Sequence, residues 1–119
     1  MDISAKLQLK PGQSIAVIGH PGELPPLADA AVNPAADPGD ADAVIAFIRL
    51  ARELDPVAGP AVAAARRDRL AWIAYPKAGQ LGTDLNRDTL AGLAAAREVQ
   101  PVRQVAIDAT WSALRFRPA

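Results

Sequence analysis

The chain has 119 residues, close to the commonest size of a single globular domain. Half of the residues are hydrophobic but only 4% are aromatic, so we expect a core of Ala, Val, Leu and Ile in which Trp72 and Trp111 are the large packing units. The 13 basic residues balance 13 acidic ones, and this neutral total argues against general binding to nucleic acid or to an anionic membrane.

The chain contains no cysteine, which excludes disulfides, thiolate metal sites and cysteine nucleophiles. His20 is the single histidine, and without a second one we expect no metal site. The first residues lack the apolar core of a signal peptide, and no apolar run approaches the roughly 20 residues of a membrane span. We therefore expect a cytoplasmic protein without a membrane partner.

The first clear element along the chain is a strand at residues 14–19, a short apolar run rich in β-branched residues. The residues before it, 1–10, suit either a short helix or a frayed strand. Five of the 11 prolines lie between this strand and the next predicted strand. They leave room for a short helix at residues 24–30 and a very short strand around 31–32, or for an irregular loop.

A second strand is predicted at residues 42–48, which are apolar on both faces as in a parallel sheet covered by helices. Helical spacing follows over residues 50–65, where Asp55 and Pro56 suit an N-cap and a first helical residue. We therefore expect this segment to form two short helices rather than one kinked helix. A third strand is predicted at residues 70–75.

The C-terminal part is predicted to form a helix that ends near Arg97, followed by strands at residues 102–108 and 111–116. Three polar residues are candidate caps of the helix, namely Thr83, Asp84 and Asn86. Because very few residues separate the last two strands, they should form an antiparallel hairpin.

This order of elements predicts a mostly parallel sheet with helices on both faces and right-handed crossovers. An antiparallel strand at the end of such a sheet is the arrangement of class I methyltransferases. We therefore expect an α/β fold over residues 1–119: a single three-layer Rossmann-like domain with a mostly parallel open sheet, a C-terminal antiparallel hairpin and a shortened methyltransferase-like topology.

Four segments of the C-terminal half carry a resemblance to a known family. They are residues 74–77 (AYPK), 83–88 (TDLNRD), 104–108 (QVAID) and 111–118 (WSALRFRP). These segments resemble small bacterial proteins of about this length, which are grouped as a domain of unknown function. The resemblance implies the Rossmann-like fold and an uncharacterised protein, and it supplies no catalytic residue.

The turn after the first strand contains Gly19, His20 and Gly22, at the place where nucleotide- or S-adenosylmethionine-binding domains carry a glycine-rich loop. The G-x-G-x-x-G pattern is not met. The acidic residue that would hold ribose hydroxyls is also missing near residues 32–34. Both departures favour a degenerate site, so we expect no cofactor, and S-adenosylmethionine is disfavoured.

A second group of candidate ligand residues should gather at the carboxyl end of the third strand. These are Lys77, Thr83, Asp84, Asn86 and Arg87. Lys77 and Arg87 would neutralise an anion, and a helix start near Asn86 would offer free N–H groups. The structural alternative has more weight: Asp84 or Asn86 caps the helix, and Arg87 pairs with a neighbouring aspartate.

The C-terminal hairpin carries Trp111, Arg115 and Arg117 on one side by its period of two. The opposite side carries Ser112, Leu114 and Phe116. An aromatic residue among arginines is typical of a nucleic-acid-binding surface, of an edge strand protected by charge or of a subunit interface. The zero net charge of the chain favours the last two.

We therefore expect a non-catalytic or vestigial Rossmann-like domain that acts through protein contacts, with a second copy of itself or an unidentified protein as partner. The competing hypothesis is a minimal S-adenosylmethionine-dependent methyltransferase or a small nucleotide- or anion-binding enzyme. Nucleic acid is not an expected partner.

Overall fold

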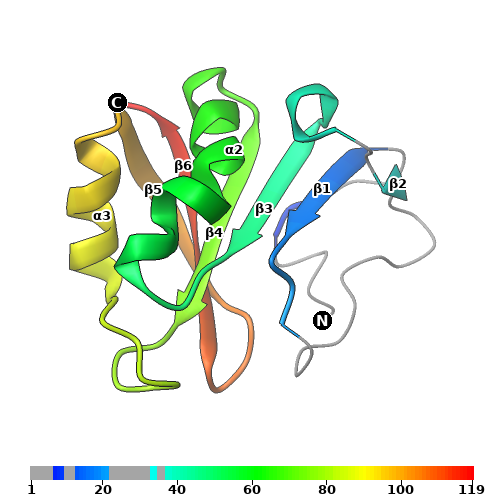
Figure 1. Ribbon diagram of the computed structural model, residues 1–119. Helices are drawn as coiled ribbons and strands as arrows, with labels where there is room; N and C mark the ends of the chain where they lie inside the picture. The colour runs from blue at the N-terminus through cyan, green and yellow to red at the C-terminus, as the bar shows by residue number, and fades with distance from the viewer. Residues whose placement is uncertain (1–6, 10–12, 22–32, 35–36) are drawn as a thin grey trace.

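The computed structural model of the chain describes residues 7–9, 13–21, 33–34 and 37–119 (Figure 1). Within these residues, six strands form one mixed sheet in the order β2-β1-β3-β4-β6-β5. The strands are β1 Ser14–Ile18, β2 Asn33–Pro34, β3 Ala43–Phe47, β4 Leu70–Pro76, β5 Val99–Ala106 and β6 Trp111–Pro118. The helical segments are η1 Pro38–Asp40, η2 Ala51–Glu53, α2 Leu54–Arg66 and α3 Arg87–Ala95.

The strand directions divide the sheet into two parts. β1 pairs in parallel with β2 and β3, and β3 pairs in parallel with β4. β6 runs antiparallel between β4 and β5. The predicted antiparallel C-terminal hairpin is therefore confirmed, and the carboxyl ends of β1, β3 and β4 meet at one edge of the sheet.

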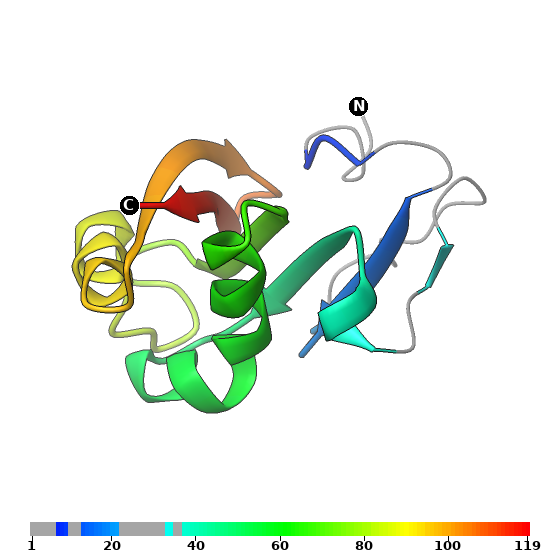
Figure 2. The same cartoon turned by 90° about the horizontal axis from the view of Figure 1, so that it is seen from above.

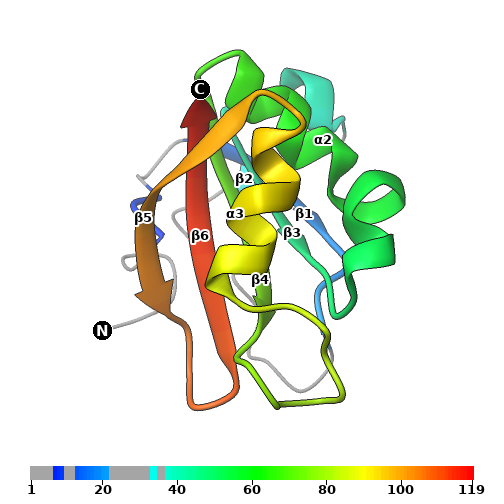
Figure 3. The ribbon, with the colours of Figure 1, turned by 90° about the vertical axis from the view of Figure 1, so that its left-hand side faces the viewer.

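The prediction of a three-layer Rossmann-like fold with a shortened methyltransferase-like topology is wrong. Both described helices lie on one face of the sheet (Figures 2 and 3), where α2 packs on β3 and β4 and α3 packs on β5. The opposite face carries no helix within the described residues. The structure is a small α/β fold with a mixed sheet, in which strands dominate.

Large side chains and residues 7–9 cover the helix-free face of the sheet. This cover explains why the sequence wrongly predicted a second layer of helices. β3 is buried along its whole length, as a strand between two helical layers would be. On this face, however, Phe47, Trp72 and Trp111 form the core with Leu7 and Ile107. The Trp72 indole Nε1 donates to the carbonyl oxygen of Leu7 at 2.9 Å, which holds residues 7–9 against the sheet. Burial of a strand on both faces thus does not require two helical layers.

The start of α2 also differs from the prediction. Asp55 is not its N-cap, because the helix already begins at Leu54 and Glu53 occupies the cap position. The Glu53 Oε1 atom accepts from the amide of Arg49 at 2.6 Å and so closes the turn before the helix. Asp55 instead forms an ion pair with Arg97, with Arg97 Nε at 2.7 Å from Asp55 Oδ1. This pair joins the first turn of α2 to the chain just after α3.

Some predictions lie outside the described residues, namely the helix at 24–30, the strand around 31–32 and most of residues 1–10. No helix in the described part of the chain is both long and apolar enough to cross a membrane.

Candidate functional site

Two segments were predicted to bind a ligand: the turn after β1 and the loop between β4 and α3. Both lie at the carboxyl ends of the parallel strands, close to the end of β3. Gly19 follows β1 and lies against the carbonyl oxygen of Phe47, the last residue of β3. Thr83, in the loop before α3, donates its hydroxyl to the carbonyl oxygen of Arg49. Both segments therefore contact the carboxyl end of β3 or the residues just after it.

Gly19 has a structural reason to be glycine. Its φ of +71° lies in the region that side chains with a Cβ disfavour, and a Cβ built there would be 2.8 Å from the Phe47 carbonyl oxygen. The neighbouring His20 ring packs edge-on against the Phe47 ring, with centroids 5.3 Å apart. Gly22 lies outside the described residues. Packing of the turn on β3 thus accounts for Gly19 without a ligand.

The three hairpin residues predicted at an interface occupy different environments. Trp111 is only 1% exposed and belongs to the core of the helix-free face. Arg115 is half-buried and donates to Gln8 Oε1 at 3.0 Å. Arg117 is exposed and pairs with Asp68, Nε to Oδ1 2.9 Å. The structure does not unite these residues in one exposed patch, and a role for them in association stays a prediction.

Thr83 and Asp84 hold the loop between β4 and α3 in place. The Thr83 hydroxyl that donates to Arg49 also accepts from the amide of Leu85 at 3.0 Å. The Asp84 carboxylate accepts from the amide of Ala51 at 2.8 Å. Both side chains are thereby engaged with backbone groups, and neither caps α3.

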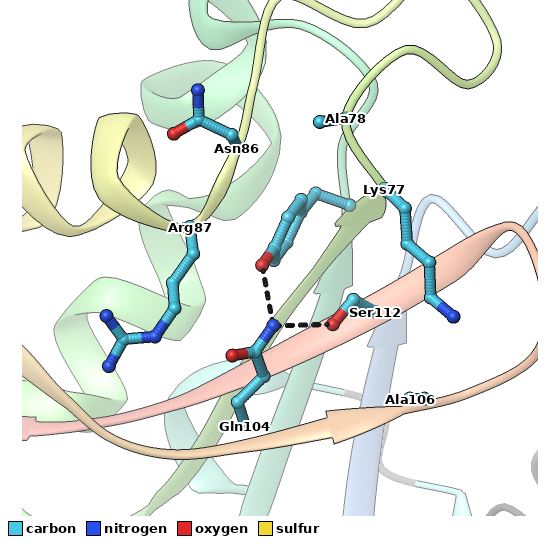
Figure 4. Close-up of a pocket in the computed structure, with 8 residues that line it drawn as sticks. Lys77, Ala78, Asn86, Arg87, Gln104, Ala106 and Ser112 are labelled. Carbon is cyan, nitrogen blue, oxygen red and sulfur yellow. Dashed lines mark hydrogen bonds between the residues drawn. The ribbon is translucent and has the colours of Figure 1, made fainter.

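A cavity of about 540 Å³ opens between the end of β4, the start of α3 and the β5–β6 hairpin (Figure 4). Its lining residues come from all of these elements and are Tyr75, Lys77, Ala78, Asn86, Arg87, Gln104, Ala106 and Ser112. The cavity thus unites Lys77, Asn86 and Arg87 from the predicted ligand group.

Asn86 immediately precedes α3 and is its N-cap. Its backbone is extended, and its Oδ1 atom accepts from the amide of Thr89 at 2.8 Å. The first amides of a helix have no helical acceptors, and Asn86 satisfies only that of Thr89. The N-terminus of α3 therefore adds partial positive charge beside Arg87.

The Arg87 guanidinium is only weakly engaged within the protein. Its Nη1 atom lies 3.7 Å from Asp88 Oδ1, and the two side chains are 55% and 94% exposed. Ion pairs this exposed contribute little to stability. Arg87 can therefore turn to a ligand at small cost.

The floor of the cavity is polar and uncharged. Gln104 Nε2 donates to the Tyr75 hydroxyl at 3.4 Å and to Ser112 Oγ at 3.3 Å (dashed in Figure 4), and Ser112 Oγ donates to the carbonyl oxygen of Val105 at 3.1 Å. Burial raises the pKa of the Tyr75 phenol above its usual value, against smaller opposing effects of Ser112 and Arg87. The phenol is therefore neutral at physiological pH.

Sequence reasoning missed Tyr75, Gln104 and Ser112 as site residues. The available signal was the alternation in β6, which correctly put Ser112 on the side opposite Trp111. Its partner Gln104 could not be found in the same way, because the register between β5 and β6 shifts between Pro101 and Arg103.

The charged residues that line the cavity are both cations. Lys77 and Arg87 lie on opposite sides of Gln104 and Ser112 (Figure 4). No carboxylate of the described chain lies within 4.0 Å of the Lys77 ammonium. No group of three or more possible metal ligands is found among the described residues.

The fold and this cavity define a small α/β protein with a cationic pocket. No known protein family, curated protein or solved structure matches the chain. The resemblance to small bacterial proteins of unknown function stays a prediction, so the function is inferred from the geometry of the site.

Proposed function

We propose that this chain binds a small anionic ligand in the cavity beside the start of α3. The observation that carries the proposal is that both charged lining residues, Lys77 and Arg87, are cations in a chain whose net charge is zero. A concave site lined by one sign of charge concentrates ligands of the opposite sign. The guanidinium suits paired contacts to a carboxylate or phosphate, and the ammonium is a compact point charge.

The lining of the cavity favours binding over catalysis. The Ser112 hydroxyl is directed at the Val105 carbonyl oxygen, so it has no base beside it to make it a nucleophile. No histidine, aspartate or glutamate is among the lining residues of the described chain. These features support a non-catalytic domain, with a small anion-binding enzyme as the competing proposal.

We also propose a cytoplasmic location, which the absence of cysteine supports. Self-association remains a further proposal. It would have to use surfaces other than the Trp111 side chain, because that side chain is buried.

Titration with inorganic phosphate, followed by the thermal midpoint, tests the binding proposal. We expect a saturable rise in the midpoint, with chloride at equal ionic strength as the reference. The double variant Lys77→Met, Arg87→Met should lose the rise. Arg67→Met is a matched control, because Arg67 is exposed and precedes β4 whereas Lys77 follows it. A rise that persists in the double variant would refute the proposal.

A further inference from the structure

We infer that the ligand carries two anionic groups joined by a short neutral segment. This inference rests on the proposed anion binding and adds the chemical class of the ligand.

The two cations come from separate elements and line the cavity on opposite sides of Gln104 and Ser112 (Figure 4). Lys77 follows the last residue of β4, and Arg87 is the first residue of α3. Gln104 and Ser112 lie between them (Figure 4). A single carboxylate that contacts one of the cations is separated from the other cation by Gln104 and Ser112. A ligand that satisfies both therefore needs an anionic group at each end.

The floor between the cations suits a neutral segment. The side-chain nitrogen of Gln104 is directed at Tyr75 and Ser112. Its carbonyl oxygen has no hydrogen-bond partner within the described part of the chain. This oxygen would repel an anionic group at the centre of the ligand, but it would accept a hydrogen bond from a hydroxyl or amide there. Burial of Tyr75 keeps its phenol neutral, so the floor holds no charge to balance a third ionic group.

The lining residues that the structure describes include no carboxylate that could neutralise Lys77 or Arg87. Asp88 is the carboxylate beside Arg87, at 3.7 Å, but it is 94% exposed and absent from the lining. A ligand with two negative charges would balance Lys77 and Arg87 without displacing a buried ion pair.

Isothermal titration calorimetry on the full chain tests this inference at an ionic strength of about 20 mM, where the Debye length is about 20 Å. The probes are malonate, succinate, glutarate and adipate, each compared with the monocarboxylate of equal carbon number. We expect one chain length to bind more tightly than its monocarboxylate by about tenfold or more, as a second charge-assisted contact provides. Phosphonocarboxylates of matching length identify whether one end prefers a phosphoryl group, and a preference for either doubly anionic series over the monocarboxylates supports two anion-binding positions.

Single variants separate this inference from the proposed function. Lys77→Met and Arg87→Met should each reduce dicarboxylate affinity to that of the monocarboxylate, whereas Arg67→Met should keep the preference. If dicarboxylates bind no more tightly than monocarboxylates, the inference is overturned while anion binding stands. If neither series nor phosphate binds, the proposed function itself fails.

Discussion

Replacement of Gly19 by Ala should destabilise the fold more than replacement of any other described glycine in an exposed turn. Gly19 combines a positive φ of +71° with a site where a Cβ would lie 2.8 Å from the Phe47 carbonyl oxygen. Gly79 has a similar φ of +82° but open space around it. The positive φ costs about 1–2 kcal/mol at both positions. Because the clash at Gly19 is with backbone, relief requires a shift of β1 against β3, which adds about 1–3 kcal/mol.

We therefore expect a loss of about 2–5 kcal/mol for Gly19→Ala and about 1–2 kcal/mol for Gly79→Ala. Gly59 lies inside α2, and outside its own helix no atom comes within 4 Å of the place that an alanine methyl would take, so Gly59→Ala should stabilise the protein by up to about 1 kcal/mol. For a chain of this size, 1 kcal/mol corresponds to roughly 4 °C in the thermal midpoint. Scanning calorimetry of the three variants measures all these changes.

The comparison also distinguishes packing from ligand binding at Gly19. If Gly19→Ala is no more destabilising than Gly79→Ala, the close approach to Phe47 does not hold. If Gly19→Ala leaves the thermal midpoint unchanged but abolishes ligand binding, the glycine serves a ligand, and our structural explanation is wrong.

Substitutions at Asn86 and Asp55 test the cap of α3 and the ion pair with Arg97. Asn86→Ala should cost about 1 kcal/mol because it removes the cap of α3. Asn86→Asp should keep the cap but weaken anion binding, because it puts a carboxylate at the cavity; equal affinity in calorimetry would contradict this. The hydrogen bond from Arg97 lowers the pKa of the Asp55 carboxyl below its usual value of 3.8. The ion pair therefore stabilises the folded protein above pH 3.8, and this stabilisation is lost as the pH falls through the lowered pKa of the folded state. Asp55→Asn should therefore lower the thermal midpoint at pH 7 but not near pH 2; an equal loss at both would refute the pair's role.

The strands could be predicted because their signal is local. The apolar runs that became β1, β3 and β4 are short, rich in branched or small residues and bounded by turn residues. The alternation in β6 likewise separates buried Leu114 and Phe116 from Arg115 and Arg117. Each of these predictions depends on a few neighbouring residues.

The roles of individual polar residues could not be predicted, because their partners are distant in sequence. The sequence offers Thr83, Asp84 and Asn86 as candidate caps of α3, and no local feature singles out Asn86. Contacts to Arg49 and Ala51, more than 30 residues away, engage the first two and leave the cap to Asn86. The same limit applies to the layers of the fold and to the floor of the cavity, which depend on how distant segments pack.

The arrangement of the two tryptophans has a practical consequence. Trp72 and Trp111 both lie on the face that lacks a helix in the described chain, whereas α2 and α3 cover the other face. Indole fluorescence therefore reports on the helix-free side of the sheet, and the helical part of the far-ultraviolet circular dichroism signal reports on the other side. Coincident transitions in urea would show that both sides unfold as a unit. An earlier change in fluorescence would show that packing around the tryptophans loosens while the helices persist, as expected if residues 7–9 detach from Trp72.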